Sequence, residues 1–187
     1  MAFRLSSGNC SADVAPLYPS QIHSLEPRST FFARQPAMLS PADINLHLHT
    51  EIPVTRMMGI EVVDFCRTHA HSTAPLEANI NHQKSAFGGS IATLGIVTGF
   101  VVVWGNLKIH DLKAELVIQH SETEFSKPAL ASIVAESRSL SDEAIGEFIA
   151  SFERTGRAQI QVTTDIFSDG KLIAKNRGTF VALTNKT

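Results

Sequence analysis

The chain has 187 residues, which is enough for one ordinary domain with a short extension. Its content of 43% hydrophobic and 18% charged residues is typical of a globular protein that buries a core, and excludes the disordered and collagen-like classes. A formal net charge of −2 gives no basic surface of the kind that binds nucleic acid or anionic membranes, so we expect neither partner.

Residues 1–38 are rich in Ser, Pro, Ala and Arg and show neither a helical nor an alternating period, so they are predicted to be a flexible N-terminal tail. Three Arg against two acidic residues weakly suggest a transit peptide, but the segment has no apolar stretch suited to secretion. Met38 could alternatively be the true start, because clear structural signals follow it. Residues 39–187 are predicted to form a single domain.

A first helix is predicted to begin after Ser40. The Ser40 side chain can cap the helix, Pro41 suits its first position, and the carboxylate of Asp43 faces the free amides of the first turn. The helix is expected to end before Pro53, because the residue before a proline is pushed out of the helical region.

Several runs have the β-branched or alternating pattern of strands, namely residues 59–69, 70–76, 113–125, 129–137, 156–167 and 171–183. In the run 156–167 apolar and polar residues alternate, which predicts a strand with one wet face. Asp169 and Gly170 then give the signature of a tight hairpin. Before it, residues 139–156 predict an amphipathic helix that Ser141 caps and Gly156 ends.

The segment 86–107, "AFGGSIATLGIVTGFVVVWGNL", contains no charged residue and is long enough to cross a bilayer. Its five Gly and its Ser, Thr and Asn residues make it a poor span, and strands precede and follow it at short distances. We therefore predict no membrane span. A helix that is apolar all round can instead be buried, and an antiparallel sheet of five or six strands curled around it would do this.

Four motifs in register resemble one family, the hotdog-fold thioesterases, and in particular the thioesterase domain of the YiiD C-terminal type. The motifs are "IPVTRMMGIEV", "NINHQKSAFGGS", "EFSKP" and "ERTGRAQIQV", and the resemblance covers about residues 40–184. The resemblance implies an α+β hotdog fold, with an antiparallel sheet wrapped around one long central helix. It also implies a homodimer or a dimer of dimers, with sites for acyl-CoA or acyl-ACP (acyl carrier protein) at the subunit interface.

Thioester hydrolysis requires donors for the developing oxyanion and a group that positions or deprotonates water. Gly88 and Gly89 are expected to supply the donors, because amides at the start of a helix are unpaired and carry the positive end of the dipole. The resemblance assigns to Asn81, seven residues before Gly88, the side chain that bonds the thioester or the water. His82 is the expected general base, because its ordinary pKa suits neutral pH. The neighbouring residues expected to contact substrate are Asn79, Phe87, Ser90 and Thr93.

One position departs from the family pattern. Many hotdog thioesterases have an Asp or Glu about two helical turns after the Gly pair, and this chain has Ile96 there. The side chains that could replace that carboxylate, if the fold brings them inward, are Asp64, Glu77, His120 and Glu122. In the relatives, the position of His120 often carries Asp, which leaves its role open.

Simpler interpretations of the same residues stay open. The glycine pair could serve only for close packing, Asn81 could cap a turn, and His82 could be a solvated loop residue. The aromatic and apolar residues that either pack the core or line an acyl tunnel are Phe100, Val103 and Trp104. The basic residues that either meet coenzyme A phosphates or lie on a solvated face are Lys84, Lys127, Arg138 and Arg157.

No metal or other cofactor is expected. His69 and His71 point to one side of a strand, but no third ligand follows at a recognisable spacing, and His47 and His49 lie about 200° apart on their helix. Cys10 and Cys66 are far apart and form no CxxC motif, so neither a disulfide framework nor a thiolate metal site is indicated. A reducing cytoplasm is the expected location.

The sequence therefore predicts an acyl-thioester hydrolase acting on acyl-CoA or acyl-ACP. Two alternatives remain. Ile96 at the carboxylate position suits a catalytically silent module that only binds acyl thioesters. A hydratase or dehydratase on the same fold is the other, because fold does not fix chemistry.

Overall fold

The structure is a computed structural model that describes residues 39–184. The tail predicted for residues 1–38 lies outside the described residues, and its boundary with the domain stays a prediction. In chain order the elements are α1 (Pro41–Glu51), α2 (Pro53–Met57), β1 (Glu61–Phe65), β2 (Ala70–Ala74), the 3₁₀ turn η1 (Glu77–Asn79), α3 (Gly88–Ile109), β3 (Glu115–Phe125), β4 (Ile133–Ser137), α4 (Asp142–Thr155), β5 (Arg157–Ser168) and β6 (Lys171–Leu183).

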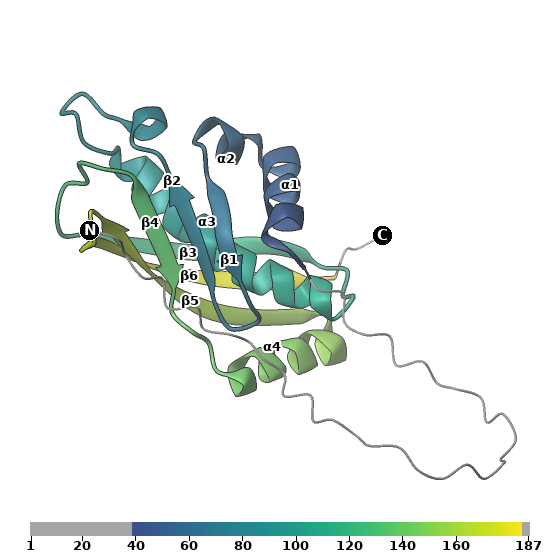
Figure 1. The fold of residues 1–187 in the computed structure, drawn as a ribbon. Helices are drawn as coiled ribbons and strands as arrows, with labels where there is room; N and C mark the ends of the chain where they lie inside the picture. The colour runs from purple at the N-terminus through teal and green to yellow at the C-terminus, as the bar shows by residue number, and fades with distance from the viewer. Residues whose placement is uncertain (1–38, 185–187) are drawn as a thin grey trace, which may run out of the picture. The chain divides into compact units, whose positions relative to one another are not determined.

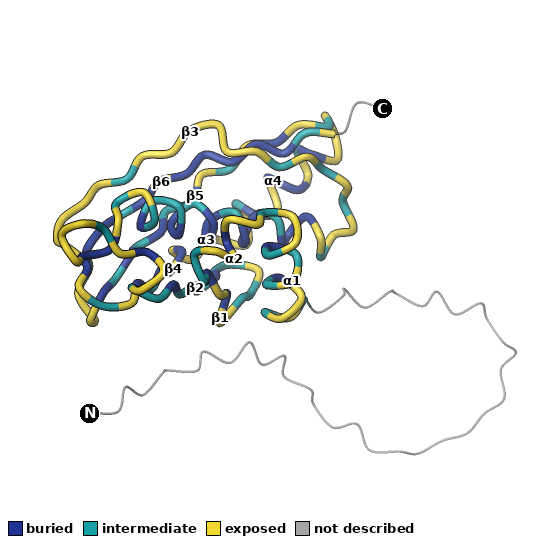
Figure 2. Tube along the Cα trace, turned by 90° about the horizontal axis from the view of Figure 1, so that it is seen from above, coloured by how far each residue is buried: buried dark blue, intermediate teal, exposed yellow. Residues whose placement is uncertain are grey.

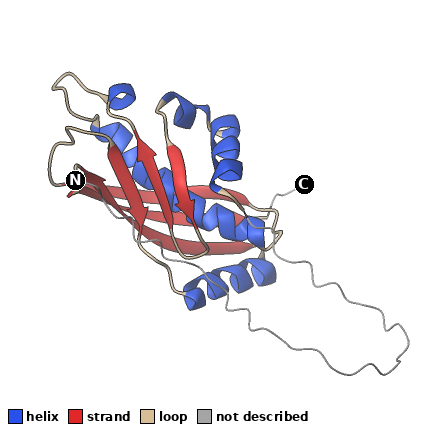
Figure 3. Cartoon of the chain, viewed as in Figure 1, coloured by secondary structure: helices blue, strands red, loops and turns tan. Residues whose placement is uncertain are grey.

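The six strands form one antiparallel sheet in the order β1-β2-β4-β5-β6-β3. The sheet curves around α3, which crosses its concave side as the longest helix of the described residues (Figure 1). Figure 3 shows the same arrangement, with one blue helix enclosed by red strands and the shorter helices outside it. The predicted α+β hotdog architecture is thereby confirmed.

The local signals act as the sequence predicts. Ser40 and Asp43 form a reciprocal capping box at α1, with Ser40 Oγ accepting from Asp43 N at 3.2 Å. The hydrogen bonds from Ser40 hold the pKa of the Asp43 carboxyl below its ordinary value. Pro53 ends α1 but also starts the short helix α2, since proline suits a first helical turn. At the other end of the chain, Gly156 ends α4 in the left-handed conformation.

The helix α3 is long and apolar enough to cross a membrane by length and composition, with a mean hydropathy of 1.7 over its most apolar window. In the fold, 67% of that window is buried inside the domain. Its glycines let the strands approach. A methyl group on Gly95 would lie 2.7 Å from Cβ of Asn176, and one on Gly99 would lie 3.0 Å from the ring of Phe180. The apolar surface of α3 is therefore used in the core.

These contacts predict opposite effects of two Gly to Ala changes. Gly95→Ala is expected to lower the free energy of unfolding by about 1–3 kcal/mol, because Asn176 has to move. Gly146→Ala in the exposed part of α4 is the matched control and is expected to raise that free energy by about 1 kcal/mol, because nothing lies within 4 Å of the added methyl. Urea denaturation of the two variants checks both signs, and equal effects would contradict the packing described here.

Candidate functional site

The N-terminus of α3 presents free amide groups. Phe87 is extended, and the first hydrogen bond of the helix runs from Ile91 N to Phe87 O at 3.1 Å. No side chain caps the helix, and within residues 39–184 the amides of Gly88, Gly89 and Ser90 have no hydrogen-bond acceptor. Three N–H groups at the positive end of a 22-residue helix are thus available to an oxygen atom of a ligand.

Two phenylalanine rings flank the glycine pair. A methyl group on Gly88 would meet the ring of Phe125 at 3.7 Å, and one on Gly89 would meet the ring of Phe87 at 2.3 Å. The two rings are 54% and 58% exposed, Gly89 is exposed and Gly88 half-buried. The glycine pair is therefore open to solvent between two aromatic side chains.

The loop that leads into α3 is closed by backbone pairing. Ile80 and Ala86 form an antiparallel bridge, and Phe87 N donates to Asn79 O at 2.7 Å. Lys84 takes the left-handed conformation at the tip, with φ 63°. Ala86 N donates to Ala129 O at 2.8 Å and so ties this loop to the loop that follows β3. The sequence motifs "NINHQKSAFGGS" and "EFSKP" thus lie side by side.

The Asn81 side chain makes four hydrogen bonds within this loop. Its Oδ1 accepts from the amides of Gln83 and Ser85 at 2.8 and 3.2 Å, and its Nδ2 donates to Ser85 Oγ and Ala86 O at 3.1 and 3.3 Å. These four bonds use the full capacity of an amide side chain. Asn81 could contact a water only if one of these four hydrogen bonds broke. Its expected role in bonding the thioester or the water stays a prediction. His82, next to it, is exposed and makes no hydrogen bond with the described residues.

The residues predicted to contact substrate lie in different surroundings. Asn79 is buried, and its Nδ2 donates to Met58 O and Pro75 O at 2.8 and 2.7 Å, whereas its Oδ1 has no partner among residues 39–184. Thr93 donates to the carbonyl of Gly89 at 2.8 Å. Ser90 is half-buried in the first turn of α3. Three of these residues therefore lie close in sequence to the free amides, namely Phe87, Ser90 and Thr93. Asn79 instead connects the loop to the end of α2 through a buried hydrogen bond.

Of the side chains considered as replacements for the missing carboxylate, Glu77 lies exposed in η1, two residues before Asn79, whereas Glu122 and Asp64 lie elsewhere. Glu122 on β3 pairs with Arg177 at 3.7 Å across the sheet. Its neighbours Ser121 and Thr123 accept hydrogen bonds from Asn176, which packs under α3. Because side chains alternate along a strand, Glu122 points to the other face of the sheet. Asp64 lies beside His69 in the β1–β2 hairpin.

A polar cluster that the sequence analysis missed lies beneath α3. Asn176 on β6 is buried, and its Nδ2 lies 2.9 Å from Ser121 Oγ and 2.8 Å from Thr123 Oγ1 on β3. Gly95, the residue before Ile96, packs directly on Asn176. The alternation of Ser121, Thr123 and Phe125 in "SETEF" was the available signal, because it places these three on the face that meets the helix.

The side of α3 that the sheet leaves open carries a mainly apolar stripe. Ile96, Phe100 and Trp104 are partly exposed there, whereas Val103 is buried in the core. Trp104 stacks on His47 of α1 with ring centroids 4.2 Å apart. Burial lowers the pKa of His47 below its ordinary value, a shift that Glu51 opposes and Lys108 increases.

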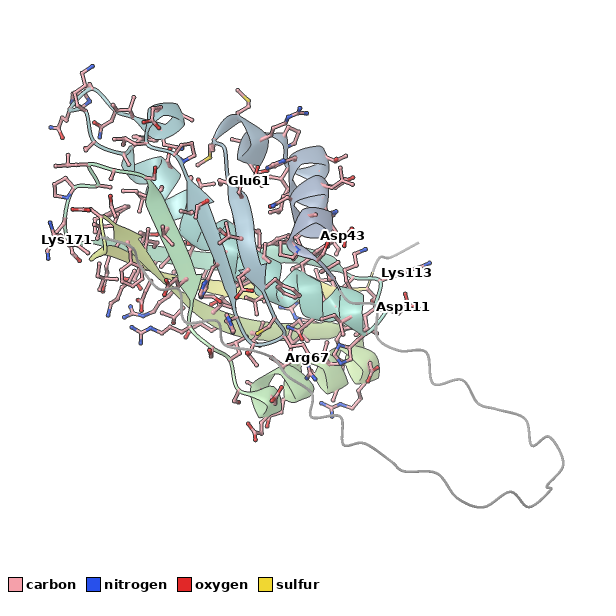
Figure 4. All side chains as sticks on the ribbon, viewed as in Figure 1. Asp43, Glu61, Arg67, Asp111, Lys113 and Lys171 are labelled. Carbon is pink, nitrogen blue, oxygen red and sulfur yellow. The ribbon has the colours of Figure 1, made fainter. Side chains whose placement is uncertain are left out.

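Basic residues separate into two groups. Lys84 and Lys127 lie in the two loops joined by the Ala86–Ala129 hydrogen bond. Lys127 N also donates to Ile173 O at 3.3 Å, which places the start of β6 and Lys171 at the same end of the domain (Figure 4). Arg138, by contrast, bonds Asp165 on β5 at 3.0 Å. The last basic candidate, Arg157, lies exposed just after α4.

His71 lies in β2 and His69 directly before it, and the two rings are on one side, as alternation predicts. The rings of His69 and His71 have centroids 5.4 Å apart. In the part of the chain from Leu39 to Thr184, no group of three His, Cys, Asp or Glu side chains is placed to hold a metal ion.

Comparisons with known proteins agree with this geometry. The family model described as "Putative thioesterase (yiiD_Cterm)" matches residues 42–184. A solved structure of a protein of unknown function from Chlorobaculum tepidum has a TM-score of 0.70 and 25% identity, over 80% of this chain and 99% of that chain.

Two further solved structures bear thioesterase names. One, described as a putative thioesterase from Shewanella oneidensis, has a TM-score of 0.69 and 25% identity over 76% of this chain and 96% of its own. The other, a thioesterase from Haemophilus influenzae, has a TM-score of 0.62 over 82% and 96% of the two chains, and at 13% identity it shows the fold alone. Because the family model spans most of the chain, this protein belongs to the thioesterase family of the YiiD C-terminal type.

Proposed function

We propose that this protein hydrolyses an acyl thioester of coenzyme A or acyl carrier protein, and that the free amides at the start of α3 polarise the thioester carbonyl. The observation that carries the proposal is the uncapped, solvent-open helix end at Gly88 and Gly89. Membership of the thioesterase family supplies the reaction class. Amides in this position stabilise an oxyanion without reorganising during the reaction, and one such donor contributes on the order of 3 kcal/mol.

His82 is the proposed general base. It is exposed on the loop that precedes the free amides and has no competing partner among the described residues. As water attacks the carbonyl carbon, His82 takes its proton, and the C–S bond then breaks and the sulfur leaves with a proton returned by His82. Asn81 has a positioning role in this scheme, because its four hydrogen bonds fix the loop that carries His82.

The surroundings of the helix end suit both parts of the substrate. Phe87, Phe125 and the stripe that begins at Ile96 offer apolar surface to an acyl chain. Lys84 and Lys127 lie in adjoining loops at the same end of α3, where they can attract an anionic carrier. Coenzyme A phosphates and acidic carrier proteins both meet that description.

A second copy of the chain is the proposed partner, as a homodimer or as half of a dimer of dimers. Strand β3 is the last strand of the sheet, so one side of its 11-residue backbone is unpaired. It is mostly exposed, as Figure 2 shows, and carries the exposed apolar residues Val117, Ile118 and Phe125. An exposed edge of this length is open to pairing with another strand, and pairing of β3 with its own copy would cover it with two-fold symmetry and shield Phe125 and Gly88 from solvent.

One observation favours a second candidate function. Ile96 stands at the position where the resemblance expects a carboxylate, and Glu122 faces away from α3. A module that binds acyl thioesters without turnover is consistent with these two facts. Saturable binding of acyl thioesters with no release of thiol, over a panel of acyl chain lengths and both carriers, would establish this alternative and refute hydrolysis.

The amide of Gly88 can be removed without disturbing the helix. Proline suits a first helical position, and the extended backbone of Phe87 (φ −65°, ψ 133°) is what a following proline requires. Gly88→Pro is expected to lower kcat about 100-fold, because one donor to the oxyanion is lost. Gly88→Ala keeps the amide and adds a methyl at an ordinary 3.7 Å from Phe125, so its kcat is expected to stay within about threefold of wild type. Equal kcat in both variants would remove the amide from the mechanism.

Removal of the proposed base should act on turnover alone. His82→Ala is expected to lower kcat at least about 100-fold, with KM and melting temperature unchanged, because the side chain is exposed and unbonded. Gln83→Ala, on the exposed neighbouring position of the same loop, is the control and should keep wild-type kcat. Full activity of the His82→Ala variant would show that His82 is not the general base.

The edge of β3 is expected to decide the oligomeric state. Wild-type protein should have the mass of a dimer or tetramer by light scattering, and Val117→Lys should shift it towards the monomer, because a charge on an exposed edge opposes pairing. Val63→Lys places the same charge on β1, the opposite edge of the sheet, and should leave a dimer intact. A monomeric wild-type protein would refute the dimer.

A further inference from the structure

The turn between β1 and β2 brings a thiol and an imidazole into contact. Cys66 Sγ lies 2.9 Å from Nδ1 of His69. Cys66 N donates to His69 O at 2.9 Å and closes the turn, so the backbone itself sets the spacing of the two side chains. Cys66 is a free cysteine and, as a residue, half-buried.

A carboxylate lies at the other nitrogen of the same ring. Asp64 Oδ2 is 3.4 Å from Nε2 of His69. The nearby negative charge of Asp64 favours the tautomer with its proton on Nε2, and that tautomer leaves Nδ1 free to accept the proton of Cys66. The hydroxyl of Thr68 lies 3.2 Å from the sulfur and can donate to it after the proton has left. This is the order of nucleophile, base and orienting group that activates thiols.

The turn is held in place by the rest of the domain. Asn106 Nδ2 donates to Arg67 O at 2.7 Å, and Leu140 N donates to Thr68 O at 2.8 Å. Arg67 also pairs with Asp142 at the start of α4 at 3.4 Å. Asn106 is 18 residues after Gly88, about 27 Å along the helix at 1.5 Å per residue, so this cluster is remote from the free amides of the same chain.

The surface beside His69 is polar. A hollow of about 340 Å³ adjoins it, lined by polar and charged residues that include His71, Glu136, Arg138 and Asp165. No apolar side chain lines this hollow, so it suits a small polar molecule and offers no apolar surface to an acyl chain.

From these contacts we infer that Cys66 is an activated thiol that exchanges with small polar disulfides such as oxidised glutathione. His69 takes the proton of Cys66, and the thiolate attacks one sulfur of the disulfide. A new S–S bond joins Cys66 to that half, the old S–S bond breaks, and the other half leaves as a thiol with the proton from His69. The small disulfide is thus the oxidant, and the product is a mixed disulfide at Cys66.

The test uses the full chain with Cys10→Ser, so that Cys66 is its one thiol. Mixed-disulfide formation with oxidised glutathione at neutral pH is followed by intact mass, with the same protein in urea as reference for an unassisted thiol. Folded Cys66 is expected to react at least about tenfold faster than unfolded Cys66, although folding half-buries it.

Three variants test which side chains cause the faster reaction of folded Cys66. His69→Gln should reduce the folded rate to the unfolded one, and Asp64→Asn should reduce it in part. His120→Gln is the matched control, because it removes an exposed imidazole from β3, at the opposite edge of the sheet from β1, and it should react like wild type. A folded rate no higher than the unfolded rate, or a His69→Gln rate equal to wild type, would overturn the inference. Neither outcome bears on the thioesterase proposal, because thioester hydrolysis is measured separately.

Discussion

The burial of α3 is the constraint on which the rest of the domain depends. From Ala86 to Leu107 the chain has no charged residue, and a helix that is apolar on all sides is stable in water only if other elements cover most of it. One sheet of six antiparallel strands provides that cover by curving around the helix. Close approach at Gly95 and Gly99 allows side chains of β6 to reach the helix backbone.

The same burial determines which parts of α3 are left for chemistry. Backbone amides at a helix start have no intrahelical partner, and here no side chain takes their place, so Gly88 and Gly89 keep free donors at the surface. A single sheet does not enclose the helix completely, so the stripe from Ile96 to Trp104 stays partly exposed and the edge of β3 stays unpaired. The proposed second copy would cover surface that one chain cannot cover by itself.

Hydrogen-bonded turns position the reactive groups at both ends of α3. At its start, the amide of Asn81 fixes the loop that presents His82. Near its end, Asn106 and the first residues of α4 hold the turn in which Cys66 meets His69. In both places the reactive side chain lies on a short loop, and buried elements supply the rigidity that a loop lacks.

The sequence by itself predicted α1, α3, α4 and the positions of the six strands, but not the short helix α2, because periodicity, capping residues and turn residues act over a few positions. Ser40, Gly156 and the Asp169-Gly170 hairpin all behave as their local chemistry requires. Only the tertiary structure decided which distant groups meet. The contact of Asn176 with Ser121 joins residues 55 positions apart, and it depends on strand order and register, which no local pattern encodes. The Cys66–His69 contact is local in sequence, yet its fixed geometry comes from α3 and α4, which pack against the turn.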